Sequence, residues 1–496
     1  MRCFVSGKKP SIPFFLASIL LVALFLRIGM LFYWERRVEP PFFFGDSETY
    51  WDLGRQIAQG KPYAYGASGE FRIFRMPGYP CLLAPLFLFG GDNPPVLFGR
   101  LLSVAFGVST VWAAWLLASR LFSGDSTLSR QARDILPLLA ASYVAVDPLQ
   151  VVSSVLILSE APFGFFMLMQ IYCWSRMFQA SRSAVPTVRN VSFLLAAMLG
   201  LSSAACVYLR PAWFYFPPFV IVLQCLGYIV PNPVAFFVRP LVDLSGRFVS
   251  GGRVPESSAS GRGIRFQHTG RLCRTSNQTD AQHARGDMMA LYLTRYLIAV
   301  SVFSICLFPW CLRNHRVSGH VVATTLQTGA SLYDGLNPEA DGSSDMRFVA
   351  RFRDSEPLDS PTYEYDVDTK MKRAALAWAA ENPGAVLRLA LHKFHRLWNC
   401  RPNEPAFSSP AVQAVVFLSY VPVLLFGLLG SVMIFRRGME WGMEYRLLLA
   451  PAIYITMLHV VFVASIRYRT PAMLLLATPA AYAFLRLVDF CSKKTT

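Results

Sequence analysis

Three carboxylates stand beside long apolar runs, where an acidic side chain can do chemistry at a membrane surface. Asp46 and Glu48 follow the first run, and Glu160 opens a later one. A carboxylate in such a place can take the proton of an attacking hydroxyl group. Simpler interpretations compete with this one. Asp46 precedes a short amphipathic pattern and could cap its helix, and Glu160 could be a solvated helix end that the helix dipole favours.

Arginines gather on the same predicted face of the membrane as these carboxylates. A guanidinium group binds a phosphate through two parallel hydrogen bonds, although an arginine at this depth could also simply extend toward the headgroups. Acid and base groups concentrated on one face indicate an anionic substrate and a catalytic carboxylate. The arginines of this set are Arg72, Arg75, Arg210, Arg313, Arg467 and Arg469.

The composition requires helices in a membrane to position these groups. Of the 496 residues, 54% are hydrophobic and 16% are charged, against roughly 25% charged residues in soluble domains. The mean hydropathy is +0.39. These values exclude an ordinary soluble enzyme, a disordered chain and a disulfide scaffold. The net charge of +17 indicates basic cytoplasmic loops and an anionic lipid or phosphate ligand, not a nucleic-acid partner.

About ten apolar runs are long enough to be read as transmembrane helices of roughly 20 residues. Lysine and arginine in the short loops favour both termini inside. The short apolar stretch after Pro77-Gly78-Tyr79-Pro80 cannot span, and that motif predicts a rigid turn. The predicted spans cover residues 12–33, 96–119, 134–151, 157–178, 191–208, 212–230, 291–309, 410–434, 447–465 and 471–488.

The remaining segments divide the chain. We expect an N-terminal membrane module over residues 12–230, with a first outer, catalytic loop at 34–95, and a basic cytoplasmic loop at 231–290. A C-terminal membrane module over 291–488 would carry a small outer subdomain at 310–405.

The histidines form no pair with zinc-ligand spacing. Most cysteines lie in apolar runs as free thiols, although Cys311 and Cys400 could form one disulfide.

The order and spacing of several motifs resemble the GT-C class of integral-membrane glycosyltransferases. The likeness is to the bacterial branch related to protein O-mannosyltransferases and to the aminoarabinose transferase of lipid A, and it runs from about residue 12 to 488. The motifs are Gly45-Asp46-Ser47-Glu48-Thr49-Tyr50, Arg75-Met76-Pro77-Gly78-Tyr79-Pro80, Asp147-Pro148 with Ser159-Glu160, Pro309-Trp310 with Arg313-Asn314 and residues 325–338, and Arg467-Tyr468-Arg469-Thr470-Pro471.

The resemblance implies an all-α GT-C fold with about ten transmembrane helices, interfacial helices in the first outer loop and a small outer subdomain. It makes Asp46 the catalytic base, with Glu48 as its companion, and Arg75, Arg467 and Arg469 candidate ligands of the donor phosphate. The remaining residues of the expected substrate-binding set are Arg72, Tyr79, Glu160, Arg210 and Arg313.

The expected reaction is inverting transfer of a sugar from a polyprenyl-phosphate donor to an envelope acceptor, which is a protein, a lipid or a glycan. The leaving phosphate needs positive charge and no proton, while the acceptor hydroxyl needs one base. No cofactor is certain from the sequence, and a divalent metal could assist. The partners are the lipid-linked donor, membrane lipids and the acceptor, and the expected location is the bacterial inner membrane. A transporter or flippase of lipid-linked glycans is the alternative, ahead of an assembly protein without chemistry of its own.

Overall fold

The computed structural model describes residues 12–37, 42, 44–181, 186–229, 276–358, 360–402, 409–436 and 442–494. Within these ranges the regular structure is helical, and the extended pairing is a single isolated bridge between Tyr65 and Phe71. The predicted all-helical class is therefore confirmed. Most of the predicted basic loop, residues 231–275, lies outside the described residues, and the rest of it opens a long helix.

Seven helices in the described part of the chain are long and apolar enough to cross a membrane. The other three predicted spans are helical too: α5 (Arg130–Val146) and α9 (Phe216–Ile229) are shorter, and α7 (Glu160–Ser181) is less apolar. The chain is an integral, multi-pass membrane protein. The seven helices are α1 (Ile12–Arg37), α4 (Val96–Phe122), α8 (Pro186–Leu209), α11 (Ser276–Ser318), α16 (Pro410–Phe435), α17 (Gly442–Val461) and α18 (Ile466–Lys494).

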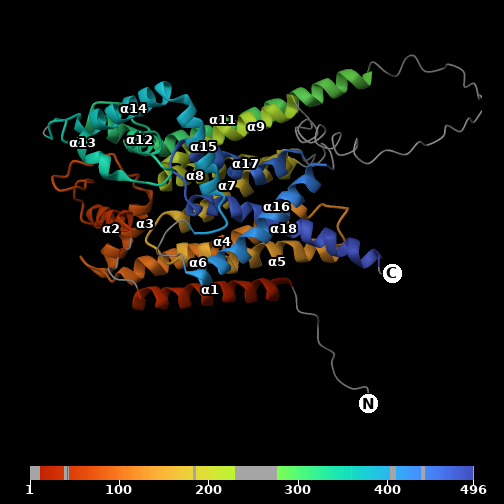
Figure 1. Ribbon diagram of the computed structural model, residues 1–496. Coiled ribbons are helices and arrows are strands. Elements are labelled where there is room, and N and C mark those ends of the chain that lie inside the picture. Colours follow the sequence, from red (N-terminus) through yellow and green to blue (C-terminus); the bar gives the residue numbers. More distant parts are fainter. Residues whose placement is uncertain are drawn as a thin grey trace, which may run out of the picture.

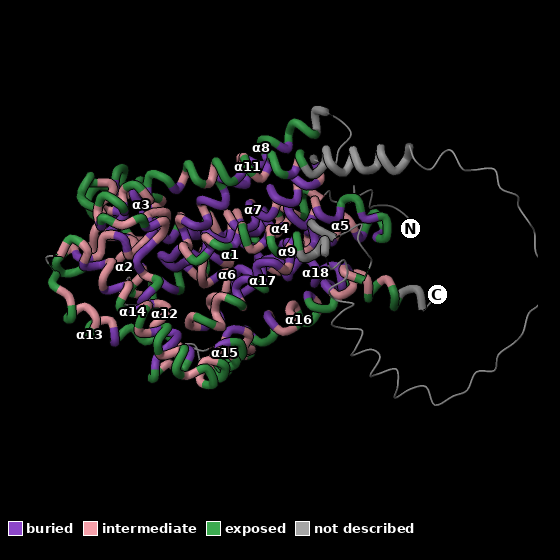
Figure 2. The backbone as a smooth tube through the Cα atoms, turned by 90° about the horizontal axis from the view of Figure 1, so that it is seen from above, coloured by how far each residue is buried: buried purple, intermediate pink, exposed green. Residues whose placement is uncertain are grey.

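The long helices lie side by side in one bundle (Figure 1). In the most apolar stretch of each helix, 72% of the α18 residues are buried, against 17% of the α1 residues. Figure 2 accordingly shows α18 within the bundle and long exposed stretches on its outermost helices. The start of α1 and the end of α18 lie at the same end of the bundle. The opposite end, which we call the loop end, carries α2 (Gly45–Ala58), α3 (Gly78–Gly90), α12 (Thr328–Gly335), α13 (Val349–Arg353) and α14 (Tyr363–Glu381).

A proline breaks the third predicted span. The expected single helix over residues 134–151 is wrong, because α5 ends at Val146 and α6 (Pro148–Ser153) follows. Pro148 has no N–H group to continue the ladder and suits a first helical position. The Asp147 side chain caps the new helix by accepting a hydrogen bond from Gln150 N at 3.1 Å. The break places α6 against α1, α16 and α18.

Two short helices follow α1 at the loop end. The first, α2 (Gly45–Ala58), is the amphipathic helix predicted after Asp46, and Gly60 at φ 63° turns the chain after it. The turn predicted at residues 77–80 is wrong, because Gly78 begins helix α3 (Gly78–Gly90). A Cβ atom at Gly78 would lie 2.5 Å from the Tyr208 carbonyl oxygen, so only glycine allows this close approach to α8.

Four further helices follow α11. Within this segment, residues 328–397, a small separate core is formed by Ala330, Phe348, Tyr363, Val367 and Met371. The first loop packs against the residues between α11 and α12. Its Ile73 is fully buried and forms a small apolar cluster with Val322 and Leu326. These contacts fix the first loop relative to the spans. The helices are α12 (Thr328–Gly335), α13 (Val349–Arg353), α14 (Tyr363–Glu381) and α15 (Pro383–Leu397), with a 3₁₀ turn at Met346–Phe348.

Candidate active site

Asp46 is held by an arginine that lies in the first loop, shortly before α3. Its Oδ1 accepts a hydrogen bond from Arg75 Nη2 at 2.5 Å. The Asp46 side chain is 38% exposed and that of Arg75 is 16% exposed. The capping interpretation of Asp46 is wrong, because the N-cap of α2 is Phe44, which makes no side-chain capping bond. Asp46 instead lies in the first helical turn, where the helix dipole favours its charge.

Several groups around Arg75 fix its orientation. Arg75 Nη1 lies 3.4 Å from Gln327 Oε1, and its guanidinium carbon lies 5.7 Å from the Tyr50 ring centre and 5.4 Å from that of Phe74. Burial, the largest single effect, lowers the pKa of Arg75, but the Asp46 carboxylate together with Tyr50 and Tyr65 outweighs it, and the pKa is raised above its ordinary value. Arg75 therefore stays charged and keeps its grip on Asp46.

The predicted site residue Tyr79 supports this arrangement from behind. Its ring meets the Tyr50 ring edge-on at a centroid distance of 5.3 Å, and its hydroxyl lies 3.1 Å from Ser103 Oγ. Because Tyr79 is only 1% exposed, its role here is packing beneath Tyr50. Tyr50 and Gln327 both occur within the sequence motifs, but no feature of those motifs marks either as a neighbour of Arg75.

Glu160 joins two arginines from distant parts of the chain. Its Oε1 accepts hydrogen bonds from Arg210 Nη2 at 2.9 Å and from Arg467 Nε. The Glu160 side chain is 4% exposed, so its charge requires these partners. Arg210 also lies over the Phe163 ring, with 5.4 Å between guanidinium carbon and ring centre. The solvated-end interpretation of Glu160 is therefore wrong.

Arg467 connects the two acidic centres. Its guanidinium carbon lies 5.2 Å from the ring centre of Phe44, the residue that precedes α2. It interacts electrostatically with both Glu160 and Asp46. The structure thus brings the carboxylates of Asp46 and Glu160 to one region at the loop end.

A cavity of ≈ 810 Å³ opens beside Arg467. Aliphatic side chains of α1, α6 and α16 form much of its wall, among them Met30, Leu149 and Val415. Its charged lining comes from helix ends near the loop end and consists of Arg37, Glu160, Arg396 and Arg467. The cavity therefore combines a long apolar wall with a polar, mainly cationic end.

Two of the other predicted arginines serve the structure of the first loop. Arg313 donates from Nη1 to the Arg72 carbonyl oxygen at 2.6 Å and from Nη2 to the Tyr63 carbonyl oxygen at 2.9 Å. Arg72 itself donates from Nη2 to the Pro361 carbonyl oxygen at 3.2 Å. These bonds join the first loop to α11 and to the segment before α14.

Arg469 and Glu48 also lie apart from the cavity. Arg469 is fully buried, where it donates to the carbonyl oxygens of Leu397 and Asn399 and lies 3.5 Å from the Tyr420 ring centre. Glu48 is exposed, and in the described part of the chain it pairs with no cation.

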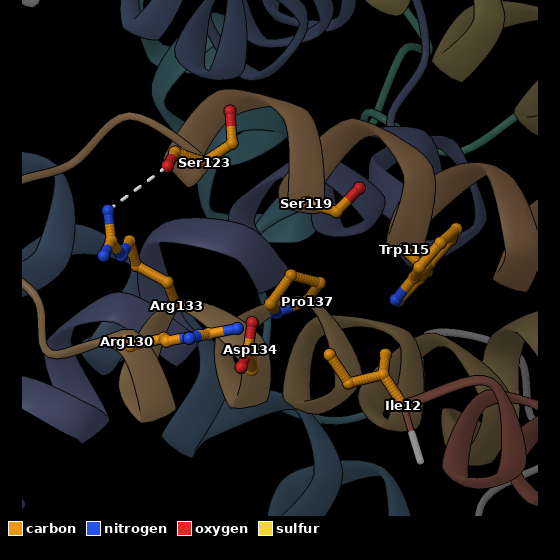
Figure 3. Close-up of a pocket in the computed structure, with 8 residues that line it drawn as sticks. All are labelled: Ile12, Trp115, Ser119, Ser123, Arg130, Arg133, Asp134 and Pro137. Carbon is orange, nitrogen blue, oxygen red and sulfur yellow. Dashed lines mark hydrogen bonds between the residues drawn. The ribbon is translucent and has the colours of Figure 1, made fainter.

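A second cavity, of ≈ 510 Å³, is shown in close-up in Figure 3. The start of α1, which lines it, places it at the end of the bundle opposite the loop end (Figure 1). It is formed where α1 and α5 begin and α4 ends, with Arg130, Arg133 and Asp134 at its wall. No residue of the predicted site lines it. Among the described residues, no three His, Cys, Asp or Glu side chains are grouped to hold a metal ion, and Cys311 and Cys400 are free thiols.

No protein-family model matches the sequence, and no curated protein matches it either. Solved structures do match. AglB, the oligosaccharyltransferase of the archaeon Archaeoglobus fulgidus, in complex with an inhibitory peptide and a dolichol-phosphate, aligns with a TM-score of 0.52 at 12% identity. The alignment covers 96% of this chain and 51% of that one. The apo form aligns with a TM-score of 0.51 at 12% identity, over 97% and 52%.

The chain has a GT-C fold. That part of the sequence-based prediction is confirmed, while the bacterial branch stays a prediction. This GT-C chain spans about half the length of the archaeal enzyme, and identity of 12% establishes the fold alone. ArnT from Cupriavidus metallidurans, bound to undecaprenyl phosphate, aligns over 94% of this chain and 76% of its own at 12% identity, but the TM-score of 0.33 is too low to support a common fold.

Proposed function

We propose that this GT-C protein is an inverting glycosyltransferase that moves a sugar from a polyprenyl-phosphate donor to an acceptor hydroxyl outside the cytoplasm. The observation that carries the proposal is the ≈ 810 Å³ cavity with aliphatic walls and a charged end that includes Arg467, which interacts electrostatically with Asp46. An isoprenoid tail fits such walls by burial of apolar surface. The archaeal protein of the same fold binds a dolichol-phosphate in its structure, which supports this class of donor.

Arg467 is the arginine that we assign to the donor phosphate. It lines the cavity, and 29% of its side chain is exposed. Its Nε is bonded to Glu160, which orients the guanidinium plane and leaves the terminal nitrogens for an anion. Positive charge at this point stabilises the leaving phosphate as the bond to the sugar breaks.

Asp46 is the base in this proposal. Because Arg75 holds Oδ1, Oδ2 is the oxygen that receives the acceptor proton. The acceptor oxygen then bonds to the anomeric carbon while the bond from that carbon to the phosphate oxygen breaks. The bonding electron pair leaves with the lipid phosphate, which needs no proton. A single displacement of this kind inverts the anomeric centre.

The experiment measures release of polyprenyl phosphate by the purified protein from a panel of polyprenyl-phosphate hexoses and pentoses, with an envelope fraction as acceptor source. We expect at least one donor to be consumed by the wild type. Asp46→Asn should lower turnover by about 10²–10⁴-fold, the range for loss of a positioned base, while donor binding persists. Glu48→Gln is the matched control, because this nearby carboxylate is exposed and should be dispensable.

Two outcomes would overturn the proposal. Full turnover by folded Asp46→Asn would remove the assigned base. If vesicle-reconstituted protein moved a labelled lipid-linked glycan across the bilayer without consuming it, the flippase alternative would replace the transferase. The buried Arg27 gives no support to transport, because its side chain is bonded to Ser154 and to the carbonyl oxygens of Ala23, Ala145 and Val144.

A further inference from the structure

Helix α15 carries an exposed apolar stripe. Leu387, Leu391 and Phe394 are 63%, 64% and 49% exposed, and their spacing of four and three residues places them on one face of the helix. A helix surrounded by water keeps such a stripe against the protein core. The stripe on α15 therefore needs a cover that the described part of the chain does not provide.

The opposite face of α15 is polar where it meets the protein. Lys393 is fully buried and donates to the carbonyl oxygens of Gly335 at 2.7 Å and Val461 at 2.6 Å. These carbonyls end α12 and α17, so the lysine charge lies at two negative helix ends. Burial nevertheless lowers the pKa of Lys393 to about 8. The bonds fix the rotation of α15, and with it the outward direction of the leucines.

Contacts with the ends of the spans set the level of α15. Lys393 reaches Val461, the last residue of the span α17, and Arg396 donates from Nε to the Ala464 carbonyl oxygen at 3.1 Å, just before α18. Both views place α15 between α12–α14 and the span α16 (Figures 1 and 2). Helix α15 is thus at the boundary between the spans and the segments beyond them.

We propose that α15 lies in the membrane interface and inserts Leu387, Leu391 and Phe394 into the lipid leaflet at the loop end. A residue beside the stripe fits this partner. Arg388 is exposed next to the leucines, and a cationic residue beside an apolar face suits anionic headgroups. This inference is independent of the proposed reaction, because it rests only on the exposure, rotation and level of the helix.

Insertion of α15 has a consequence for the cavity. Arg396, one turn beyond the buried Lys393, lines the cavity together with Ser343, which precedes α13. A leaflet that takes up α15 therefore supports one wall of the cavity.

The experiment places an environment-sensitive nitrobenzoxadiazole label at Leu391→Cys in the full chain, on a background without other cysteines, reconstituted into phosphatidylcholine–phosphatidylglycerol vesicles. The emission should shift to shorter wavelength, and brominated lipid should quench it. The matched control is Leu358→Cys between α13 and α14, a leucine that is 56% exposed, whose label should keep water-like emission without quenching. Leu387→Cys provides a second reporter on the stripe if the first variant does not elute as a single species.

Three results would overturn the proposal. Water-like emission without quenching from both stripe positions would show that no lipid covers α15. Shifted emission that lipid does not quench, and that disappears on dilution of protein in the vesicles, would assign the stripe to a second copy of the chain. Equal quenching at residue 358 would show that the attached label enters the bilayer by itself, whatever the position of the helix.

Discussion

Arg75 Nη2 lies 2.5 Å from Asp46 Oδ1 and joins two residues that are 29 positions apart in the sequence. This bond assigns different tasks to the arginines at the loop end. Arg75 donates a hydrogen bond from Nη2 to the Asp46 carboxylate, and its Nη1 faces Gln327. Arg467, in contrast, lines the cavity. We therefore assign Arg75 to positioning the base and Arg467 to binding the donor.

Substitution of Arg75 tests the positioning role. Arg75→Ala should lower kcat by about 10²-fold, the effect of misplacing a reacting group by about 1 Å. The KM for the donor should change little, because Arg75 does not line the cavity. Arg75→Lys should restore part of kcat, since it returns the charge without the planar fork. A rise in donor KM with unchanged kcat would instead make Arg75 a ligand of the phosphate.

Substitution of Arg467 should have the reverse pattern. Arg467→Ala removes the guanidinium group at the cavity and one of the two partners of Glu160. Loss of a charge-assisted contact to a phosphate corresponds to about 1.5–3 kcal/mol, or roughly 10- to 150-fold in donor affinity. Binding of undecaprenyl phosphate to the purified variant, measured by native mass spectrometry, checks this. Affinity equal to that of the wild type would remove Arg467 from the donor site.

Much of the helical framework could be predicted from the sequence, because apolar runs and amphipathic spacing are local signals. The interactions of the site could not, because they join distant residues: Glu160 and Arg467 are 307 positions apart. One local rule would have improved the prediction. Arg467 and Arg469 lie two positions apart on helix α18, and residues at that spacing do not share a face. Both therefore could not point into the same cavity.

Arg469 should accordingly affect stability more than binding. Arg469→Met replaces the guanidinium group with an apolar side chain and leaves the carbonyl oxygens of Leu397 and Asn399 without this donor. Leaving buried polar groups unsatisfied costs about 1–3 kcal/mol each. We expect a lower midpoint of thermal unfolding, with donor affinity per folded molecule retained. A variant of unchanged stability that no longer binds the donor would contradict this assignment.

The side of the membrane that the loop end faces can be measured directly. Ser68 lies in the first loop and Ser126 in the turn between α4 and α5, and both are exposed. On a cysteine-free background, a membrane-impermeant maleimide added to intact cells should label Ser68→Cys and leave Ser126→Cys unlabelled. Labelling in permeabilised cells controls for accessibility at both positions. The opposite result in intact cells would turn the proposed active face toward the cytoplasm.

Glu364 should make the docking of the first loop sensitive to pH. Its carboxylate accepts hydrogen bonds from the backbone N–H groups of Arg72 and Ile73 at 2.9–3.1 Å. Burial raises its pKa from 4.5 to about 7, although these bonds and the nearby Arg72 and Arg313 act in the opposite direction. Because the folded-state pKa lies above the unfolded one, the protonated form stabilises the fold. That contribution is complete below pH 4.5 and is lost as the pH rises through about 7.

The expected loss in the free energy of unfolding is on the order of 3 kcal/mol at most. It should appear as a fall in the midpoint of thermal unfolding of the wild type between pH 5 and pH 8. Glu364→Gln keeps an acceptor oxygen for the two backbone N–H groups but does not titrate, so its midpoint should vary less over the same interval. Asp354→Asn, at an exposed carboxylate after α13, is the matched control and should keep the wild-type profile. If Glu364→Gln and the wild type show parallel profiles, the pH dependence arises elsewhere and Glu364 is not the group that couples the first loop to α14.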